Sequence, residues 1–345
     1  MFDKKFLPYK KKIDKFFYLI KKISRVNPLI TVLILHEYFR NIYPSDIYIK
    51  KKRLKKDPVK NIVSVIEELE QIANSFLKLG SYESNISKNK INTQNLYGKL
   101  WRERFLDFSL DQKKFLKKLL YKLNYNPNKL KGKKILDMGC GSGRFSAAFA
   151  RLGAKKVYGI DLGSTGISIG KKLIKKYNLK NLTFKKTSVL NLPFKNNYFD
   201  FVFCKGVLHH TGNLKKGLEE FTRMIKVNGH GYLYLYGRGG IFWYSRKEMR
   251  KIMKIISPDF CINVLKLYGM PAERTIFVDT WHVPIEEHVS KQFLENYLTK
   301  KNFIFKKYSK SSDPLPIELE FMENYRNFDI MYGDGELRYL IKKVK

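Results

Sequence analysis

One segment, Lys133 to Phe145 (KKILDMGCGSGRF), constrains the fold more than any other part of the chain. Ile135, Leu136 and Met138 form a short apolar run of the kind found in buried parallel strands. A glycine-rich turn follows at residues 139–143, and apolar residues with helical spacing follow the turn. Glycine permits positive φ angles and a close approach of the backbone to a ligand. Strand, glycine turn and helix together predict the nucleotide crevice of a doubly wound sheet.

The spacing of the glycines indicates which ligand this turn suits. A dinucleotide site has the pattern G-x-G-x-x-G/A, in which the third small residue packs the helix on the strand. Here Arg144 occupies that position, so an NAD-dependent oxidoreductase is the least favoured interpretation. Asp161 ends the next expected strand, residues 156–161, where its carboxylate can accept hydrogen bonds from two ribose hydroxyls. We therefore expect an adenosyl group without the pyrophosphate type of turn.

At these residues the sequence resembles the class I S-adenosylmethionine-dependent methyltransferases. Their first motif looks like ILDMGCGSG, and their second ends in an acidic residue like Asp161. The run FDFVFCKGVLHHT at 199–211 is similar to the fourth motif of the type 11 group, which includes the ubiquinone and menaquinone C-methyltransferases. The resemblance covers about residues 96–340 and implies S-adenosyl-L-methionine as cofactor. The implied cofactor-binding residues are Asp137, Gly139, Cys140, Gly141, Gly143, Asp161, Leu162, Ser188, Val189, Cys204 and Lys205.

One of these positions departs from the family pattern. The family has an acidic residue where Ser188 stands, and that acid accepts a hydrogen bond from the adenine amino group. Ser188 can accept the same bond without a charge, so we expect a weaker contact.

The resemblance and the order of expected elements predict an α/β fold. It is a doubly wound, mostly parallel seven-stranded sheet of the Rossmann-like methyltransferase type. We expect helices at 59–79, 164–177, 214–225 and 290–301, and further strands at 182–187, 231–236 and 303–308. The polar stretch 81–93 separates a helical N-terminal extension of unknown role, 1–95, from a methyltransferase domain, 96–345. A helical insertion after the fifth strand, at about 241–280, is expected to form a substrate lid.

The formal net charge of +37 leaves two interpretations open. Most of the basic residues are lysines spread along the chain, which favours compositional drift and solvated faces. The alternative is an anionic partner such as RNA, an acidic membrane surface or a phosphorylated substrate. Residues 10–23 form a basic amphipathic pattern, which predicts either peripheral membrane contact or, as we prefer, a helix packed on the protein.

The apolar stretches and the cysteines of the sequence indicate the cellular compartment of the protein. The longest apolar stretch, 26–35, is too short to span a bilayer, so no transmembrane segment is expected. The three cysteines have neither disulfide nor metal spacing, and no signal peptide is readable. These features predict a reducing, cytoplasmic location and no metal site.

Methyl transfer is an in-line displacement, so the enzyme mainly aligns the reacting atoms, and a general base is needed only for a protonated nucleophile. The catalytic candidates are His209 and His210, beside the fourth strand. Candidate substrate contacts are Trp101, in the aromatic segment ahead of the first motif, and Tyr244 and His282, in or after the insertion.

The residues at the end of the fourth expected strand limit the class of molecule that can be the methyl acceptor. Residues 204–207 read CKGV rather than a D/N/S-P-P-Y/F tetrad, and no cysteine follows a proline. Both facts argue against the familiar nucleic-acid methylases. The preferred acceptor is a small molecule, a sugar or a lipid-linked compound methylated on O, N or C. An RNA-modifying methyltransferase and a catalytically silent binding module remain as alternatives.

Overall fold

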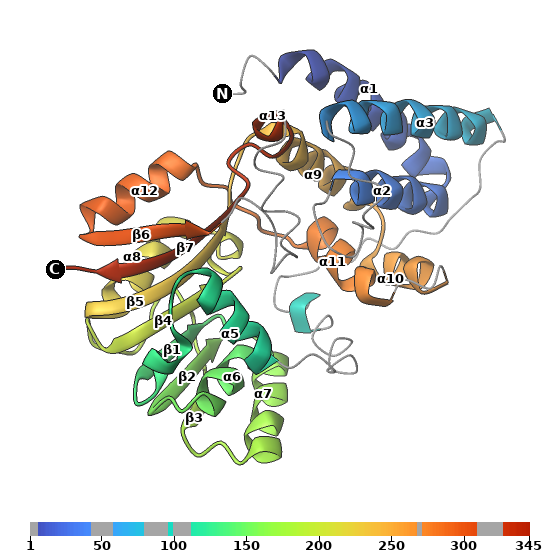
Figure 1. Cartoon of the computed structure of the whole chain (residues 1–345). Coiled ribbons are helices and arrows are strands. Elements are labelled where there is room, and N and C mark those ends of the chain that lie inside the picture. Colours follow the sequence, from blue (N-terminus) through green and yellow to red (C-terminus); the bar gives the residue numbers. More distant parts are fainter. Residues whose placement is uncertain (1–5, 43–57, 79–95, 99–111, 268–270, 309–326) are drawn as a thin grey trace. The chain divides into compact units, whose positions relative to one another are not determined.

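The computed structural model describes residues 6–42, 58–78, 96–98, 112–267, 271–308 and 327–345 (Figure 1). Its internal contacts divide the chain into two units. The helical unit comprises residues 1–90, 238–283 and 311–335, and the sheet unit comprises 91–237, 284–310 and 336–345. The residues predicted as an insertion thus group with the N-terminal residues. The boundary predicted between residues 95 and 96 falls beside a stretch outside the described residues and stays a prediction.

The sheet unit contains one seven-stranded sheet, whose strand order is β3-β2-β1-β4-β5-β7-β6. Strands β1 to β5 are parallel, and β7 runs antiparallel between β5 and β6. The predicted mostly parallel, doubly wound sheet is therefore confirmed. The order reverses between β1 and β4, which is where such sheets bind ligands. The strands are β1 (Lys134–Met138), β2 (Lys156–Asp161), β3 (Leu182–Lys186), β4 (Phe199–Lys205), β5 (Ile225–Tyr236), β6 (Phe303–Tyr308) and β7 (Glu336–Lys343).

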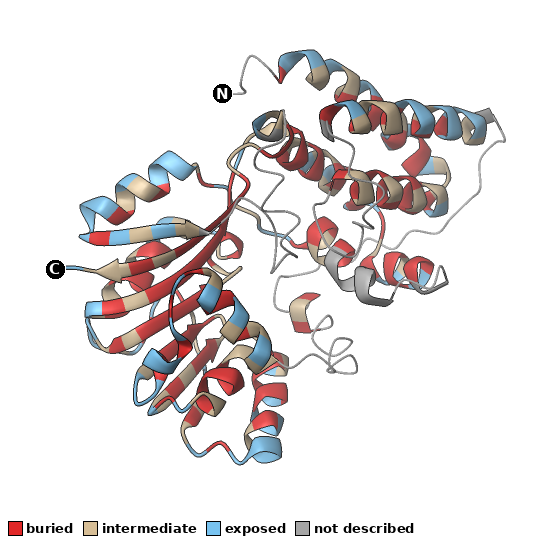
Figure 2. Ribbon diagram, viewed as in Figure 1, coloured by how far each residue is buried: buried red, intermediate tan, exposed pale blue. Residues whose placement is uncertain are grey.

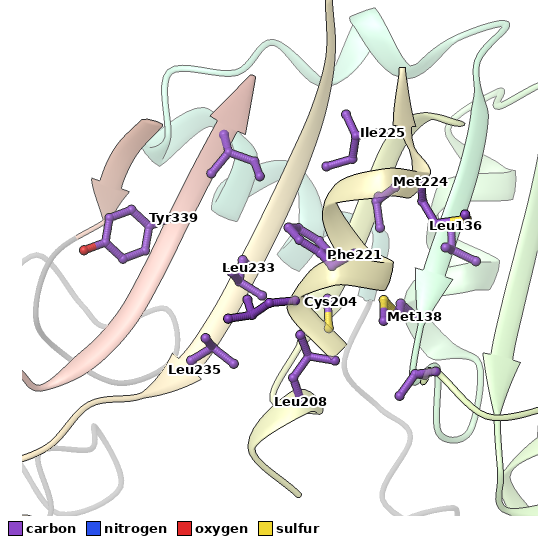
Figure 3. Packing of buried hydrophobic residues seen from close by; sticks show 14 of the residues in the cluster. Leu136, Met138, Cys204, Leu208, Phe221, Met224, Ile225, Leu233, Leu235 and Tyr339 are labelled. Carbon is purple, nitrogen blue, oxygen red and sulfur yellow. The ribbon is translucent and has the colours of Figure 1, made fainter. Parts of the chain in front are cut away.

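Two layers of helices cover the sheet (Figure 1). Helix α6 contacts both α5 and α7, and α6 and α7 pack on β1 to β3. Helices α8 and α12 contribute Leu218, Phe221, Leu294 and Leu298 to the core cluster on the other face, part of which Figure 3 shows. The helices are α5 (Gln112–Lys122), α6 (Arg144–Arg151), α7 (Ser164–Tyr177), α8 (Leu214–Met224) and α12 (Lys291–Lys300), with short 3₁₀ turns η1 (Pro127–Leu130) and η2 (Leu208–His210).

Alternation along β1 decides which of its side chains reach the site. Leu136 and Met138 point into the cluster beneath α8 (Figure 3). Because successive side chains of a strand face opposite sides, Ile135 and Asp137 point toward α6. On that side Phe149 of α6 packs on Phe201 and Phe203 of β4, at centroid distances of 5.9 and 5.3 Å. The sequence therefore places one carboxylate, that of Asp137, in a mostly apolar layer under the start of α6.

The helical unit buries the apolar face of its first helix. Five side chains of α1 are at most 4% exposed (Figure 2): Ile13, Phe16, Phe17, Ile20 and Ile23. Phe16 stacks on Tyr38 of α2 at a centroid distance of 5.0 Å, and the Tyr38 hydroxyl bonds the Ser245 hydroxyl of α9 at 2.6 Å. This packing confirms the preferred interpretation of residues 10–23. It contradicts the membrane alternative, because the apolar face that would enter a bilayer is covered.

The predicted insertion is helical, as expected. The helices of this unit are α1 (Leu7–Val26), α2 (Pro28–Ile42), α3 (Pro58–Lys78), α9 (Gly240–Met253), α10 (Pro258–Leu267), α11 (Pro271–His282) and α13 (Phe328–Tyr332). The role of these helices as a lid stays a prediction. Within the described ranges, no helix is both long and apolar enough to cross a membrane.

Candidate active site

The glycine turn after β1 has a conformation that side chains would obstruct. Gly139 and Cys140 both donate their backbone N–H to the Ile160 carbonyl of β2, at 2.8 and 2.9 Å. Gly139 has a φ of +77°, and a Cβ atom there would lie 2.4 Å from both methyl groups of Val207. Glycine is thus required at this position for conformation and for space. Sequence reasoning missed Val207, which closes one side of the turn.

A second contact fixes the far end of the turn. A Cβ atom at Gly143 would lie 2.3 Å from the Phe184 ring of β3. The same ring lies within 2.8 Å of the Cβ positions of Gly159 and Gly170. Three glycines thus form a slot that holds one phenylalanine, and the slot joins the turn to β2, β3 and α7. Sequence reasoning missed Phe184 because the three glycines that it contacts lie far from it and from one another in the sequence.

Asp161 lies against the turn, as the sequence predicted. Its Oδ2 accepts the Gly141 N–H at 2.8 Å, and its Oδ1 accepts the Gly163 N–H at 2.7 Å. Burial raises the pKa of Asp161, while the backbone N–H groups of Gly163, Gly141 and Leu162 oppose that rise. A carboxylate has about four lone-pair positions, so the backbone bonds from Gly141 and Gly163 leave capacity for a further donor such as a ribose hydroxyl.

Asp137 has a structural task beside any ligand contact. It is 3% exposed, and its Oδ2 accepts a hydrogen bond from the Ser146 hydroxyl at 2.5 Å. Burial raises the pKa of Asp137 to about 7, and nearby Asp161 adds to the rise while Ser146 opposes it. The carboxyl group therefore ties the end of β1 to the first turn of α6. Ser146 was missed from the sequence, where it is one small polar residue in an apolar helix.

Two of the predicted cofactor residues direct their side chains into the core. Val189 and Cys204 are 6% and 0% exposed and belong to the cluster beneath α8, in which Figure 3 labels Cys204. Burial raises the pKa of the Cys204 thiol, so it stays protonated. The role of these two residues in binding the cofactor stays a prediction, and their buried side chains do not supply the contact. Any contact from them to a ligand would come from the backbone.

The other predicted cofactor residues lie around the strand ends. Cys140 is half-buried, and burial raises the pKa of its thiol well above the usual range. The Ser188 hydroxyl accepts the Leu190 N–H at 3.1 Å, which holds the loop after β3. Leu162 is 42% exposed, so its side chain is free to cover a ligand. Lys205 ends β4, with its Nζ 5.6 Å from the Phe145 ring centroid.

The two candidate catalytic histidines differ in their surroundings. The His209 side chain is fully buried, and its ring stacks on Tyr236 at a centroid distance of 3.7 Å. The His210 side chain is 8% exposed, and its Nδ1 lies 2.7 Å from the Ile285 carbonyl oxygen. A carbonyl only accepts, so Nδ1 donates and the neutral ring keeps its lone pair on Nε2. The tautomer of the neutral His210 ring is thus fixed by this contact, and the catalytic role of both histidines stays a prediction.

A buried polar group beside these histidines was not predicted. Tyr234 of β5 donates its hydroxyl to Glu336 of β7 at 2.6 Å, and Glu336 also pairs with Arg338. The Arg338 guanidinium lies 4.5 Å from the Tyr234 ring centroid. All three side chains are at most 8% exposed. The antiparallel pairing of β5 and β7 brings them together across about 100 residues of sequence, so no local pattern announces them.

The predicted substrate contacts are not all described. Trp101 lies outside the described residues. Tyr244 donates its hydroxyl to Asp14 within the helical unit. His282 lies 3.3 Å from the Cys261 thiol in the same unit, and burial and Arg250 lower its pKa to about 4. The substrate role of all three stays a prediction. Among the described residues, no cluster of three His, Cys, Asp or Glu side chains has the arrangement of a metal site.

A family model described as a methyltransferase domain matches residues 129–237. An uncharacterised protein of Rickettsia prowazekii is 33% identical over 39% of this chain and 54% of its own length. A tRNA U34 carboxymethyltransferase of Campylobacter hominis is 30% identical over 36% of this chain and 45% of its own length. A ubiquinone biosynthesis O-methyltransferase of Acinetobacter baumannii is 30% identical over 32% of this chain and 46% of its own length. The chain thus spans about half the length of the curated relatives it matches.

Solved structures with a similar arrangement are more distant. PKMT2 from Rickettsia typhi is 18% identical over 67% of this chain and 54% of that chain, with a TM-score of 0.48. An S-adenosylmethionine-dependent methyltransferase from Mesorhizobium loti is 14% identical over 62% of this chain and 92% of that chain, with a TM-score of 0.41. At these scores the fold assignment depends on the strand order and on residues 129–237.

Proposed function

We propose that this chain, whose residues 129–237 form a class I S-adenosylmethionine-dependent methyltransferase domain, moves a methyl group to a small-molecule, sugar or lipid-linked acceptor. The recognition made from the two motifs is confirmed by the family model and by curated methyltransferases among the relatives. The acceptor and the roles of individual residues are the proposal.

One observation carries the cofactor assignment. The carboxylate that ends β2 accepts the Gly141 N–H at 2.8 Å, so the acidic residue and the glycine turn lie at one point of the sheet edge. Had Asp161 faced away from the turn, the two motifs would have had no common ligand. We assign the ribose hydroxyls to Asp161, the methionine end to the turn at 139–141, and the adenine to Leu162, Ser188 and the backbone of Val189.

The residues of this chain align the methyl group of the cofactor with the acceptor. S-adenosyl-L-methionine brings the activated methyl group when it is bound. The turn, held by Ile160 and Val207, fixes the direction in which that group points. An in-line displacement then depends mainly on placing the acceptor on the opposite side, and proximity supplies much of the rate.

We place the acceptor near the ends of β4 and β5, beside His210. Its Nδ1 is committed to the Ile285 carbonyl, so Nε2 is the atom that would take a proton from an O–H or N–H acceptor. His209 supports this arrangement by packing between its neighbours: its ring stacks on Tyr236 at a centroid distance of 3.7 Å and meets the His210 ring edge to face at 4.2 Å.

A second candidate acceptor is RNA. A relative named as a tRNA carboxymethyltransferase matches about a third of the chain, and the net charge of +37 suits a polyanion. The sequence after β4 lacks the tetrad of the familiar exocyclic-amine methylases, which is why we rank this candidate second.

Calorimetric titration with S-adenosyl-L-methionine tests the cofactor assignment. We expect binding to the whole chain and its loss in Asp161→Ala. Asp200→Asn is the control, because it also removes one carboxylate but lies at the opposite end of the sheet, bound to Lys226 and the Lys134 N–H. No binding by the unmodified chain would refute the proposal. Labelled methyl groups, followed into the small-molecule, lipid and RNA fractions of a cell extract, then identify the acceptor class.

A further inference from the structure

The lysines of the sheet unit are not distributed evenly. Between residues 112 and 199 the sequence has two acidic residues, Asp137, which accepts the Ser146 hydroxyl, and Asp161, which accepts the Gly141 N–H. Helices α5, α6 and α7, which form one layer, contain no acidic residue at all. The opposite layer is mixed, since α8 and α12 include Glu219, Glu220 and Glu295. Compositional drift alone would enrich lysine on both layers without removing acids from one.

Backbone bonds bring lysines from three loops together at the edge where the parallel strands begin. Gly132 N–H donates to the Gly153 carbonyl, Lys155 N–H to Lys133, and Val157 N–H to Asn181, at 2.8 to 2.9 Å. These bonds align the loops before β1, β2 and β3. We call the resulting surface the basic edge; its exposed members are Lys129, Lys131, Lys133, Lys155, Lys175, Lys176 and Lys180.

The positive charge of this surface lowers the pKa of a neighbouring side chain, His230. His230 has a pKa of about 4, lowered first by burial and then by Lys342, Lys129 and Lys133. A carboxylate does lie nearby, but Asp200 is already bound by the Lys226 ammonium at 2.9 Å and the Lys134 N–H at 2.8 Å. Helix dipoles explain the lysines at the end of α7, because cations stabilise helix C-termini. They do not explain Lys131, Lys133, Lys155 or Lys180, which lie in loops.

We propose that the basic edge is a docking surface for nucleic acid, at the end of the sheet opposite to the methyl-transfer site. The phosphates of a nucleic-acid strand suit a surface with several exposed ammonium groups and no free carboxylate described among them. Aromatic rings also lie on this layer: Tyr121 and Tyr177 are 56% and 39% exposed. Exposed rings among cations suit single-stranded nucleic acid, whose bases stack on them.

A membrane surface fits the same layer less well. Binding to a bilayer interface relies on exposed aliphatic or aromatic side chains that enter it, together with cations. Apart from the two tyrosines, the large hydrophobic side chains of α5, α6 and α7 are not among the exposed ones. We therefore favour nucleic acid and make the membrane an outcome of the test.

Fluorescence anisotropy with a labelled 20-nucleotide RNA and the matching single-stranded DNA, at several salt concentrations, tests the proposal. The test variant combines Lys131→Gln, Lys133→Gln and Lys155→Gln. The control combines Lys215→Gln, Lys291→Gln and Lys300→Gln, three exposed lysines of the mixed layer, so both variants lose the same charge.

We expect the test variant to weaken RNA binding on the order of 10- to 100-fold and the control to change it little. The slope of log affinity against log salt should fall by about 2 in the test variant, because about 0.7 is lost per phosphate contact on a single strand. Equal losses in both variants, or no RNA binding at low salt, would overturn the proposal. So would loss of binding to vesicles rich in anionic lipid with RNA binding unchanged. Cofactor titration of the test variant is expected to match the unmodified chain, which keeps this result separate from the proposed function.

Discussion

Replacing Gly166 by alanine should separate helix α7 from the glycine turn. Gly166 lies in the first turn of α7, and a Cβ atom there would be 2.4 Å from the Gly141 carbonyl oxygen and 2.8 Å from its carbon. Ordinary contact begins at 3.4 Å, so one backbone segment must move by about 1 Å. Both obstructing atoms are backbone atoms, which a side-chain rotation does not relieve.

The displacement has a cost that follows from the contacts of Gly141. Its N–H donates to Asp161 at 2.8 Å, and a shift of about 1 Å would break that bond. A hydrogen bond to a charged group contributes about 1.5–3 kcal/mol, whereas alanine in a helix gains about 1 kcal/mol over glycine. We expect a net loss of roughly 0.5–2 kcal/mol in the free energy of unfolding. Affinity for S-adenosyl-L-methionine should fall about 10- to 100-fold, because the turn and Asp161 no longer hold one geometry.

Urea unfolding and calorimetric titration measure the two effects. Ser168→Ala is the control, because Ser168 is exposed on the same helix and its loss should leave cofactor affinity unchanged. The reasoning is refuted if Gly166→Ala binds the cofactor as tightly as the unmodified chain. If the unmodified chain does not bind it, the proposed function fails instead, and the stability prediction still stands.

Three further perturbations test other parts of the structure. Ser146→Ala should lower the free energy of unfolding by about 1–3 kcal/mol, because the Asp137 carboxylate loses its buried donor; urea unfolding at pH 8, with the carboxylate charged, measures this. Burial lowers the pKa of His36 from 6.5 to about 4, so its neutral form contributes stability above pH 6.5 that is lost as the pH falls toward 4. The loss should be about 3 kcal/mol, and the same stability–pH profile in His36→Leu would contradict the assignment. Glu336→Ala should cost about 3 kcal/mol by removing a buried carboxylate from Arg338 and Tyr234, and a melting temperature equal to that of Glu295→Ala would count against the pairing.

The sequence was most informative where local pattern and long-range packing coincide. The run from β1 through the glycine turn to α6 and β2 was predicted because hydrophobic run length, glycine spacing and one carboxylate all agree. The bounds of α7 were predicted to the residue, since it begins after Gly163 and ends at Asn178, which adopts a left-handed conformation. These features depend on near neighbours in the chain.

What escaped prediction depends on distant pairing. Tyr234, Glu336 and Arg338 meet because β7 inserts antiparallel beside β5, and no periodicity in either strand indicates that contact. Val189, in the loop after β3, and Cys204, in β4, match the family motif, yet both side chains lie in the core. Motif position identifies a residue near a ligand but does not say which way its side chain points.

The discontinuous make-up of the helical unit has a practical consequence for dissecting this protein. Because α9 supplies Ser245 to Tyr38 and α2 supplies Phe39 to Phe242, deletion of the first 90 residues would not release an intact remainder. The apolar sides of α9 would be left uncovered, and the shortened product would be prone to aggregate. Expression trials seeking a minimal catalytic fragment should therefore remove residues 1–90, 238–283 and 311–335 together and rejoin each pair of internal ends with a short flexible linker.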